Sequence, residues 1–207
     1  MEKNKYIETN EIQTLPNGNK QLLLEKSSWL AFFYKKITVF DFVYKRLSYK
    51  TQILFYTSDN VLCSLENVEC VTVSCKTTFI RKNITNVTPY YFYEIIIIAR
   101  GKDTPYVVEK GKLGTDGSGF EALNEKAKEI AEFLNCHFLP GILGNKITLK
   151  RPFTGEFENI KDMIVYEDAD TQIKNEKSQR IKLGILQFLI QIVIMLVIFI
   201  AAIFGLF

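Results

Sequence analysis

The last stretch of the chain, residues 183–207, constrains the fold most, because it reads LGILQFLIQIVIMLVIFIAAIFGLF and holds no charged residue. At ~1.5 Å per residue, a helix of this length covers roughly 37 Å, more than the ~30 Å hydrocarbon core of a bilayer. A buried core helix of this length rarely lacks every charge. We therefore expect a transmembrane helix, whose anchoring residues are Leu183, Gly184, Ile185, Leu186, Phe188, Leu189, Ile190, Ile192, Val193, Ile194, Leu196, Phe199 and Phe207.

The charges that flank this stretch predict its orientation. Nothing polar follows Phe207, whereas one acid, Glu176, and four basic residues precede the stretch. By the positive-inside rule, the preceding domain is expected in the cytoplasm, as in a single-pass, tail-anchored membrane protein. The basic residues are Lys174, Lys177, Arg180 and Lys182.

Two amides interrupt the apolar stretch. Gln187 and Gln191 are four residues apart and share one helix face. In lipid, an unpaired amide favours a hydrogen bond to a neighbouring helix, so the pair predicts self-association. The alternative is that both lie close enough to the basic interface to stay hydrated.

The rest of the chain is expected to hold one β-rich domain, since the sequence contains 16 Phe and 10 Tyr, which favour sheet. A polar segment covers 1–20, the domain covers 21–153, and a linker that is first acidic and then basic covers 154–182. Alternating apolar residues separated by turn signals, among them 57–60, predict an antiparallel meander. The run 90–99 is apolar on both faces, which predicts a central strand covered from both sides. The expected strands are 21–25, 37–44, 52–56, 61–65, 68–79, 90–99, 106–109 and a short one at 147–151.

One stretch, 28–47, has two possible structures. Its β-branched and aromatic residues favour a strand over 37–44. Its apolar residues are also spaced as on a helix face, and such a helix would suit a membrane surface. The residues concerned in that alternative are Trp29, Phe32, Phe33, Lys35, Lys36, Lys45 and Arg46.

The strongest helix signal in the domain covers 119–135. Ser118 is a suitable N-cap with Glu121 at the capping-box spacing, and Asn135 can end the helix in a left-handed turn. One face is apolar and is expected to pack on the sheet. That face consists of Phe120, Leu123, Ala127, Ile130, Ala131 and Leu134.

No motif predicts catalysis, a metal or a cofactor. The cysteines Cys63, Cys70, Cys75 and Cys136 lack zinc-site spacing and are expected to be reduced, packed thiols. His137 adjoins Cys136, but neighbouring residues usually point apart, so we do not expect a dyad. The glycine-rich segment 111–119 has the wrong order for a phosphate-binding loop and is expected to be a flexible connection.

The order of strands followed by one helix is that of a pleckstrin-homology-like (PH-like) domain, here an α+β fold in which the helix caps a β-meander or barrel. Three segments, VECVTV at 68–73, ARG at 99–101 and EKAKEIAEFL at 125–134, carry a further resemblance. Through them, residues 68–138 resemble the photosystem I assembly factor family and bacterial membrane proteins with a similar domain. In the assembly factor the membrane spans precede the domain. The resemblance implies the fold class, and no site or photosynthetic role.

The function expected from these features is that of a membrane-anchored, non-enzymatic module that binds a protein partner or supports a membrane complex. The basic loops at Arg81 and Lys82 and at Arg100 and Lys102 are the candidate contacts. An alternative is recognition of anionic lipid by the same loops. An enzyme with an unrecognised site is the third possibility, and nucleic acid is not expected as a partner.

Overall fold

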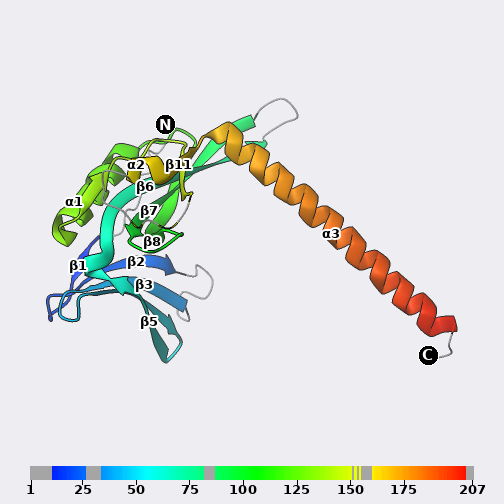
Figure 1. Ribbon diagram of the computed structural model, residues 1–207, viewed down its shortest axis with the longest axis horizontal. Helices are drawn as coiled ribbons and strands as arrows, with labels where there is room; N and C mark the ends of the chain where they lie inside the picture. Colours follow the sequence, from blue (N-terminus) through cyan, green and yellow to red (C-terminus); the bar gives the residue numbers. More distant parts are fainter. Residues whose placement is uncertain are drawn as a thin grey trace, which may run out of the picture. The chain divides into compact units, whose positions relative to one another are not determined.

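The structure, a computed structural model, describes residues 11–26, 34–81, 87–150, 152, 154 and 160–203 (Figure 1). These residues form mostly antiparallel sheet with a few helices. The chain divides into two compact units, Met1–Ala169 and Asp170–Phe207.

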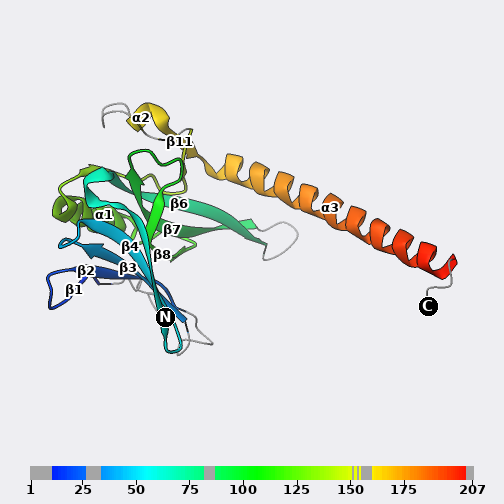
Figure 2. The ribbon, with the colours of Figure 1, turned by 60° about the horizontal axis from the view of Figure 1, so that its bottom comes forward.

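Five strands of the first unit form an antiparallel sheet in chain order (Figure 2). The stretch predicted as a strand over 37–44 does form one, but the strand ends at Asp41. There the carboxylate accepts hydrogen bonds from the N–H groups of Val43 and Tyr44, at 3.1 and 3.0 Å, and the chain turns. A helix is therefore wrong for the described part of 28–47, whereas Trp29, Phe32 and Phe33 lie outside the described residues. The strands are β1 (Gln13–Thr14), β2 (Lys20–Lys26), β3 (Tyr34–Asp41), β4 (Arg46–Ile53) and β5 (Tyr56–Ser64).

The hairpin between β4 and β5 turns earlier than predicted. Residues 57–60 have the composition of a turn, yet they lie within β5, where Asp59 is opposite Lys50. The turn is made instead by Leu54 and Phe55, since Ile53 pairs with Tyr56. Leu54 has a φ of 54°, a left-handed conformation that is unfavourable for a residue with a Cβ.

A second sheet has four strands in the order β8-β7-β6-β9, and β9 runs parallel to β6. No strand was expected at the position of β9, which follows α1. The prediction of a strand at 90–99 that is covered from both sides is confirmed. Ile95 and Ile97 belong to one buried cluster and Ile96 and Ile98 to another. The strands are β6 (Val68–Arg81), which follows the short helix η1 (Leu65–Asn67), β7 (Val87–Ala99), β8 (Tyr106–Gly114) and β9 (His137–Leu139).

Helix α1 (Phe120–Leu134) covers the first of these clusters together with the five-stranded sheet. The predicted apolar face is confirmed, because Leu123, Ala127 and Ile130 are fully buried. Asn135 ends the helix in a left-handed conformation, as predicted. The predicted N-cap is wrong: Gly119 occupies that position, and the Ser118 hydroxyl bonds to Asp116 instead.

The second cluster lies on the other face of the four-stranded sheet. It is covered by a two-stranded sheet, β10 (Lys146–Leu149) and β11 (Ile164–Glu167), and by the short helix α2 (Ile160–Met163). Residues 160–167, expected in the linker, thus contribute to the core.

The prediction of a PH-like barrel capped by one helix is wrong. The described strands form three separate sheets and do not close into one barrel. The physical reason is the packing of β7 and β6. Their apolar residues face both ways, so the four-stranded sheet is buried as a middle layer between the five-stranded sheet and the β10–β11 pair.

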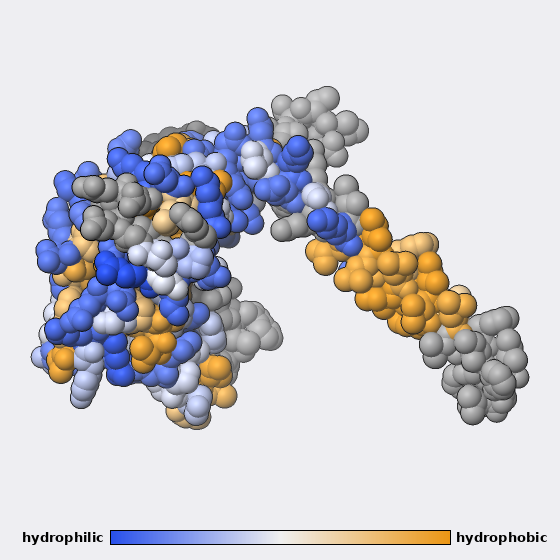
Figure 3. All heavy atoms as spheres, viewed as in Figure 1, coloured by the Kyte–Doolittle hydropathy of each residue, from blue (hydrophilic) through white to orange (hydrophobic). Residues whose placement is uncertain are grey.

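The described part of the second unit lies in helix α3 (Ala169–Ile203), which begins at the last residue of the first unit. No helix in the part of the chain that the structure describes is both long and apolar enough to cross a membrane. Polar residues precede the apolar ones along α3 (Figure 3). The absence of such a helix from the described residues contradicts the predicted transmembrane helix over 183–207. With it, the predicted integral membrane association, the single-pass tail anchor and the membrane location with a cytoplasmic domain are also wrong.

Candidate protein-binding surface

The candidate site begins with the position of β5 at the end of its sheet. β4 is the one strand of the described chain that pairs with β5, so the outer backbone groups of β5 face no other described strand. From Tyr56 to Val61 the pairing with β4 is regular, and a bulge follows at Leu62. We call residues 56–61 the β5 edge.

The composition of the β5 edge lacks the usual protection. Edge strands generally carry Lys, Pro or inward-pointing charges, because unpaired N–H and C=O groups otherwise attract further strands. The β5 edge has neither Lys nor Pro, and its one charged residue is Asp59. Asp59 itself lies 3.4 Å from the Arg46 guanidinium, which reduces its effect as a repelling charge. The edge is therefore chemically suited to pair with an extended segment.

Apolar side chains are exposed directly beside this edge. Ile53, Leu54, Phe55 and Tyr56 form the end of the β4–β5 hairpin, and we call these four residues the hairpin tip. Phe55 is fully exposed and Tyr56 is 70% exposed. Figure 3 shows apolar atoms at this end of the molecule's first unit. Four consecutive exposed apolar residues are unusual on a surface without a partner.

The hairpin extends from a firmly held sheet. The hydroxyl of Thr38 donates to the carbonyl of Val108 at 3.0 Å, and that of Tyr49 donates to the carbonyl of Val107 at 2.7 Å. Tyr106 donates in turn to the carbonyl of Leu62 at 2.9 Å. Burial raises the pKa of Tyr49 to about 12, so its hydroxyl stays a donor. These bonds fix β3, β4 and β5 against β8.

The basic loops predicted from the sequence do not meet at this surface. Arg100 and Lys102 follow β7, while Arg81 is the last residue of β6 and pairs with Val87 at the other end of β7. A strand of this length separates its two ends by roughly 40 Å. Arg100 is ion-paired with Glu69, the side chain of Arg81 is not described, and Lys82 lies outside the described residues. All four positions stay predictions, and of the described ones, Arg81 lies at the other end of β7 from Arg100 and Lys102.

Two further predicted elements have other positions. Lys45 and Arg46 are engaged with the acids Glu66 and Asp41, at 2.8 and 3.5 Å. Gln187 and Gln191 are both exposed on α3, and self-association through them stays a prediction.

Cys136 and His137 are neighbours in the chain but differ in exposure. Cys136 is half-buried against the core, whereas the adjacent His137 is exposed. Burial raises the pKa of the Cys136 thiol to about 12, which keeps it protonated at neutral pH. The four cysteines are free thiols, and among the described residues no three His, Cys, Asp or Glu side chains gather as metal ligands.

The sequence analysis missed one buried polar group. Glu109 on β8 is fully buried, accepts a hydrogen bond from the Tyr93 hydroxyl at 2.9 Å and lies 2.6 Å from the ammonium of Lys126 on α1. Burial and the charge of Glu109 raise the pKa of Tyr93, so Tyr93 is a donor and no base. The three residues come from three elements, β7, β8 and α1, so no local sequence pattern predicts that they meet. The group ties the helix to the sheet.

The glycine-rich segment 111–119 is also partly different from the expectation of a flexible connection. Gly111 to Gly114 continue β8, and only the remainder connects the strand to α1. A Cβ at Gly111 would lie 2.6 Å from the ring of Tyr93. Gly111 thus makes room for the tyrosine that bonds Glu109.

Comparison with known proteins adds no function to this geometry. The chain matches no family model, no curated protein and no solved structure.

Proposed function

We propose that this protein is a non-enzymatic module that binds an extended segment of a partner protein along the β5 edge. The open, unprotected edge beside the hairpin tip is the observation that carries the proposal. A segment added next to β5 would gain main-chain hydrogen bonds, as in other cases of β-strand addition.

The side chains of β5 indicate the kind of segment that fits. Successive residues alternate between the two faces, so Thr57, Asp59 and Val61 share one face. Val61 is 52% exposed, and cross-strand pairs with β-branched or aromatic residues are favourable. The partner segment is therefore extended, largely uncharged and rich in β-branched or aromatic residues. Phe55 and Tyr56 offer it an aromatic anchor at one end.

Selection from a displayed peptide library with the full chain tests this function. We expect enriched peptides of the composition described above. Their affinity should fall about tenfold or more for Val61→Lys, which places a protecting charge on the edge, and for Phe55→Ser. The matched control is Val43→Ser, at an exposed position, 66%, in the turn between β3 and β4. It should leave the affinity unchanged.

Three results would contradict the proposal. One is the absence of any enriched peptide, and another is enriched peptides that bind Val61→Lys as well as the original chain. The third is a doubled molar mass of the chain alone that Val61→Lys reduces to the monomer, because the edge would then pair with a second copy.

A further inference from the structure

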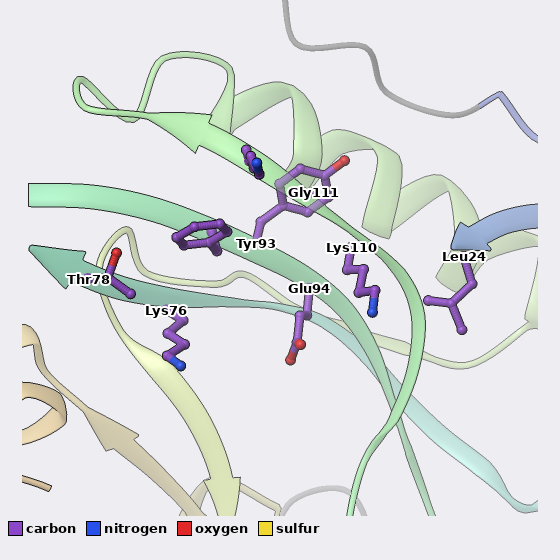
Figure 4. A pocket seen from close by; sticks show the side chains of 9 residues that line it. Leu24, Lys76, Thr78, Tyr93, Glu94, Lys110 and Gly111 are labelled. Atoms are coloured by element: carbon purple, nitrogen blue, oxygen red, sulfur yellow. The ribbon is translucent and has the colours of Figure 1, made fainter. Parts of the chain in front are cut away.

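A second candidate site lies on the four-stranded sheet, in the same unit, and no residue of β5 lines it. It is a pocket of about 520 Å³, within the ~300–1,000 Å³ typical of small-ligand sites. Figure 4 shows Lys76, Glu94 and Lys110 leaving three adjacent strands on one side, whereas the ring of Tyr93 lies on the other, beside Gly111.

The strand register places the charged groups around one aromatic ring. Phe92 on β7 is directly opposite Lys76 on β6 and Lys112 on β8. The three residues therefore form one row across the sheet, with a lysine on each side of a half-buried phenyl ring. Two strand spacings separate the Cα atoms of the lysines by roughly 10 Å, so both flexible side chains can reach one group above the ring.

The next row supplies the one acid that lines the pocket. Glu94 is opposite Lys110, so opposite charges are neighbours there. No ion pair among the described residues involves Lys76 or Lys112. Two positive charges thus remain for an anion, and the ammonium groups of lysines are common ligands of phosphate.

Contacts on the core side of the four-stranded sheet hold the pocket in a fixed geometry. Tyr93 leaves the same strand toward the core, and its hydroxyl bonds Glu109, which is paired with Lys126. This contact fixes β7 and β8 relative to α1. A rigid site loses less conformational freedom when a ligand binds.

A second aromatic ring, that of Tyr90, extends the aromatic surface formed by Phe92. The ring of Tyr90 lies 5.1 Å from that of Phe92 in a tilted arrangement. The exposed part of such rings can stack on a planar group of a ligand. The hydroxyl of Thr78 provides a further polar group in the same pocket.

From these features we infer that the pocket binds a small organic phosphate that carries a planar ring, of the size of a nucleoside monophosphate. The ring stacks on Phe92, and the phosphate lies between Lys76 and Lys112. This site is independent of the β5 edge, so either proposal can fail alone.

Calorimetric titration of the full chain with AMP, GMP, CMP and UMP tests the inference, with adenosine and inorganic phosphate as partial probes. We expect at least one nucleotide to bind with a Kd below about 1 mM, and each partial probe to bind about tenfold more weakly or worse. Lys112→Ala and Lys76→Ala should each weaken nucleotide binding about tenfold, because each removes a charge-assisted contact. The matched control, Lys50→Ala on β4, should have no effect.

A ring variant separates stacking from charge. Phe92→Leu keeps an apolar side chain of similar packing and removes the planar ring. It should therefore weaken the binding of nucleotides, while the binding of inorganic phosphate stays unchanged. The inference is overturned if no nucleotide binds, if the lysine variants bind as the original chain does, or if adenosine binds as tightly as AMP. It is also overturned if a single-stranded oligonucleotide of about ten nucleotides binds more than ~10-fold tighter than every mononucleotide, since the aromatic surface would then serve a polymer.

Discussion

The buried contact between Glu109 and Lys126 offers the sharpest test of how the first unit is held together. Lys126→Met keeps most of the side-chain volume but leaves the carboxylate of Glu109, which is fully buried, without its counter-charge. Removing one partner of a buried ion pair typically costs about 3–5 kcal/mol. We expect the free energy of unfolding to fall by about that amount.

A double variant distinguishes two causes of the lost stability, namely the buried charge of Glu109 without Lys126 and the packing that Lys126 provided. In Glu109→Gln with Lys126→Met the buried charge is absent, and the Gln carbonyl can still accept the hydrogen bond that Tyr93 donates at 2.9 Å. Replacing a buried pair by uncharged groups is often nearly neutral, so the double variant should recover most of the loss. The two substitutions are therefore expected to be strongly non-additive.

Urea unfolding followed by intrinsic fluorescence measures these effects, because all 10 tyrosines precede Asp170 and so report on the first unit. Lys128→Met is the matched control. Lys128 is exposed on the same helix, and its change should cost no more than about 0.5 kcal/mol. The reasoning is refuted if Lys126→Met costs less than about 1 kcal/mol, or if the double variant is as unstable as the single one.

Two further predictions follow from the burial of the thiols and from the hairpin turn. Burial raises the pKa of Cys63 to about 11 and that of Cys70 to about 12, so each thiol stabilises the fold below its unfolded pKa and this contribution is lost as pH rises from about 9 toward 12. Thiolate absorbance should accordingly be absent from the native chain near pH 9 and present in urea, and native thiolates at that pH would contradict the assignment. Leu54→Gly should raise the free energy of unfolding by about 0.5–1 kcal/mol in urea titrations, since glycine adopts the φ of 54° without strain. Leu54→Ala keeps the Cβ and should give no such gain, whereas equal stability of the two variants would show that the turn is unstrained.

Local sequence patterns were sufficient to predict elements whose buried residues recur with the period of a single strand or helix. The run 90–99 is apolar on both faces apart from Glu94, and it forms a strand with Ile95 and Ile96 buried in different clusters. The apolar face of α1 and its end at Asn135 could also be predicted from the sequence, because a helix period and a left-handed cap are both local properties.

Local patterns failed where pairing with a distant strand decided the outcome. Residues 57–60 resemble a turn, but pairing with β4 makes them strand and moves the turn to Leu54. The predicted span at 183–207 rested on the length and apolarity of that stretch, whereas α3 starts at Ala169 and is polar over its first part. In both cases the neighbouring residues along the chain gave the wrong boundary.

The sequence alone determined that this protein has a β-rich unit with one amphipathic helix packed on it, because those features depend on periodicity within short segments. Only the tertiary structure decided the sites. Lys76, Phe92 and Lys112 lie on three strands and become neighbours through cross-strand register, and Glu109 meets Lys126 across the contact of a strand with a helix. The β5 edge likewise exists only because no other described strand pairs there. Such contacts are set by the packing of segments far apart in the chain, which no single segment encodes.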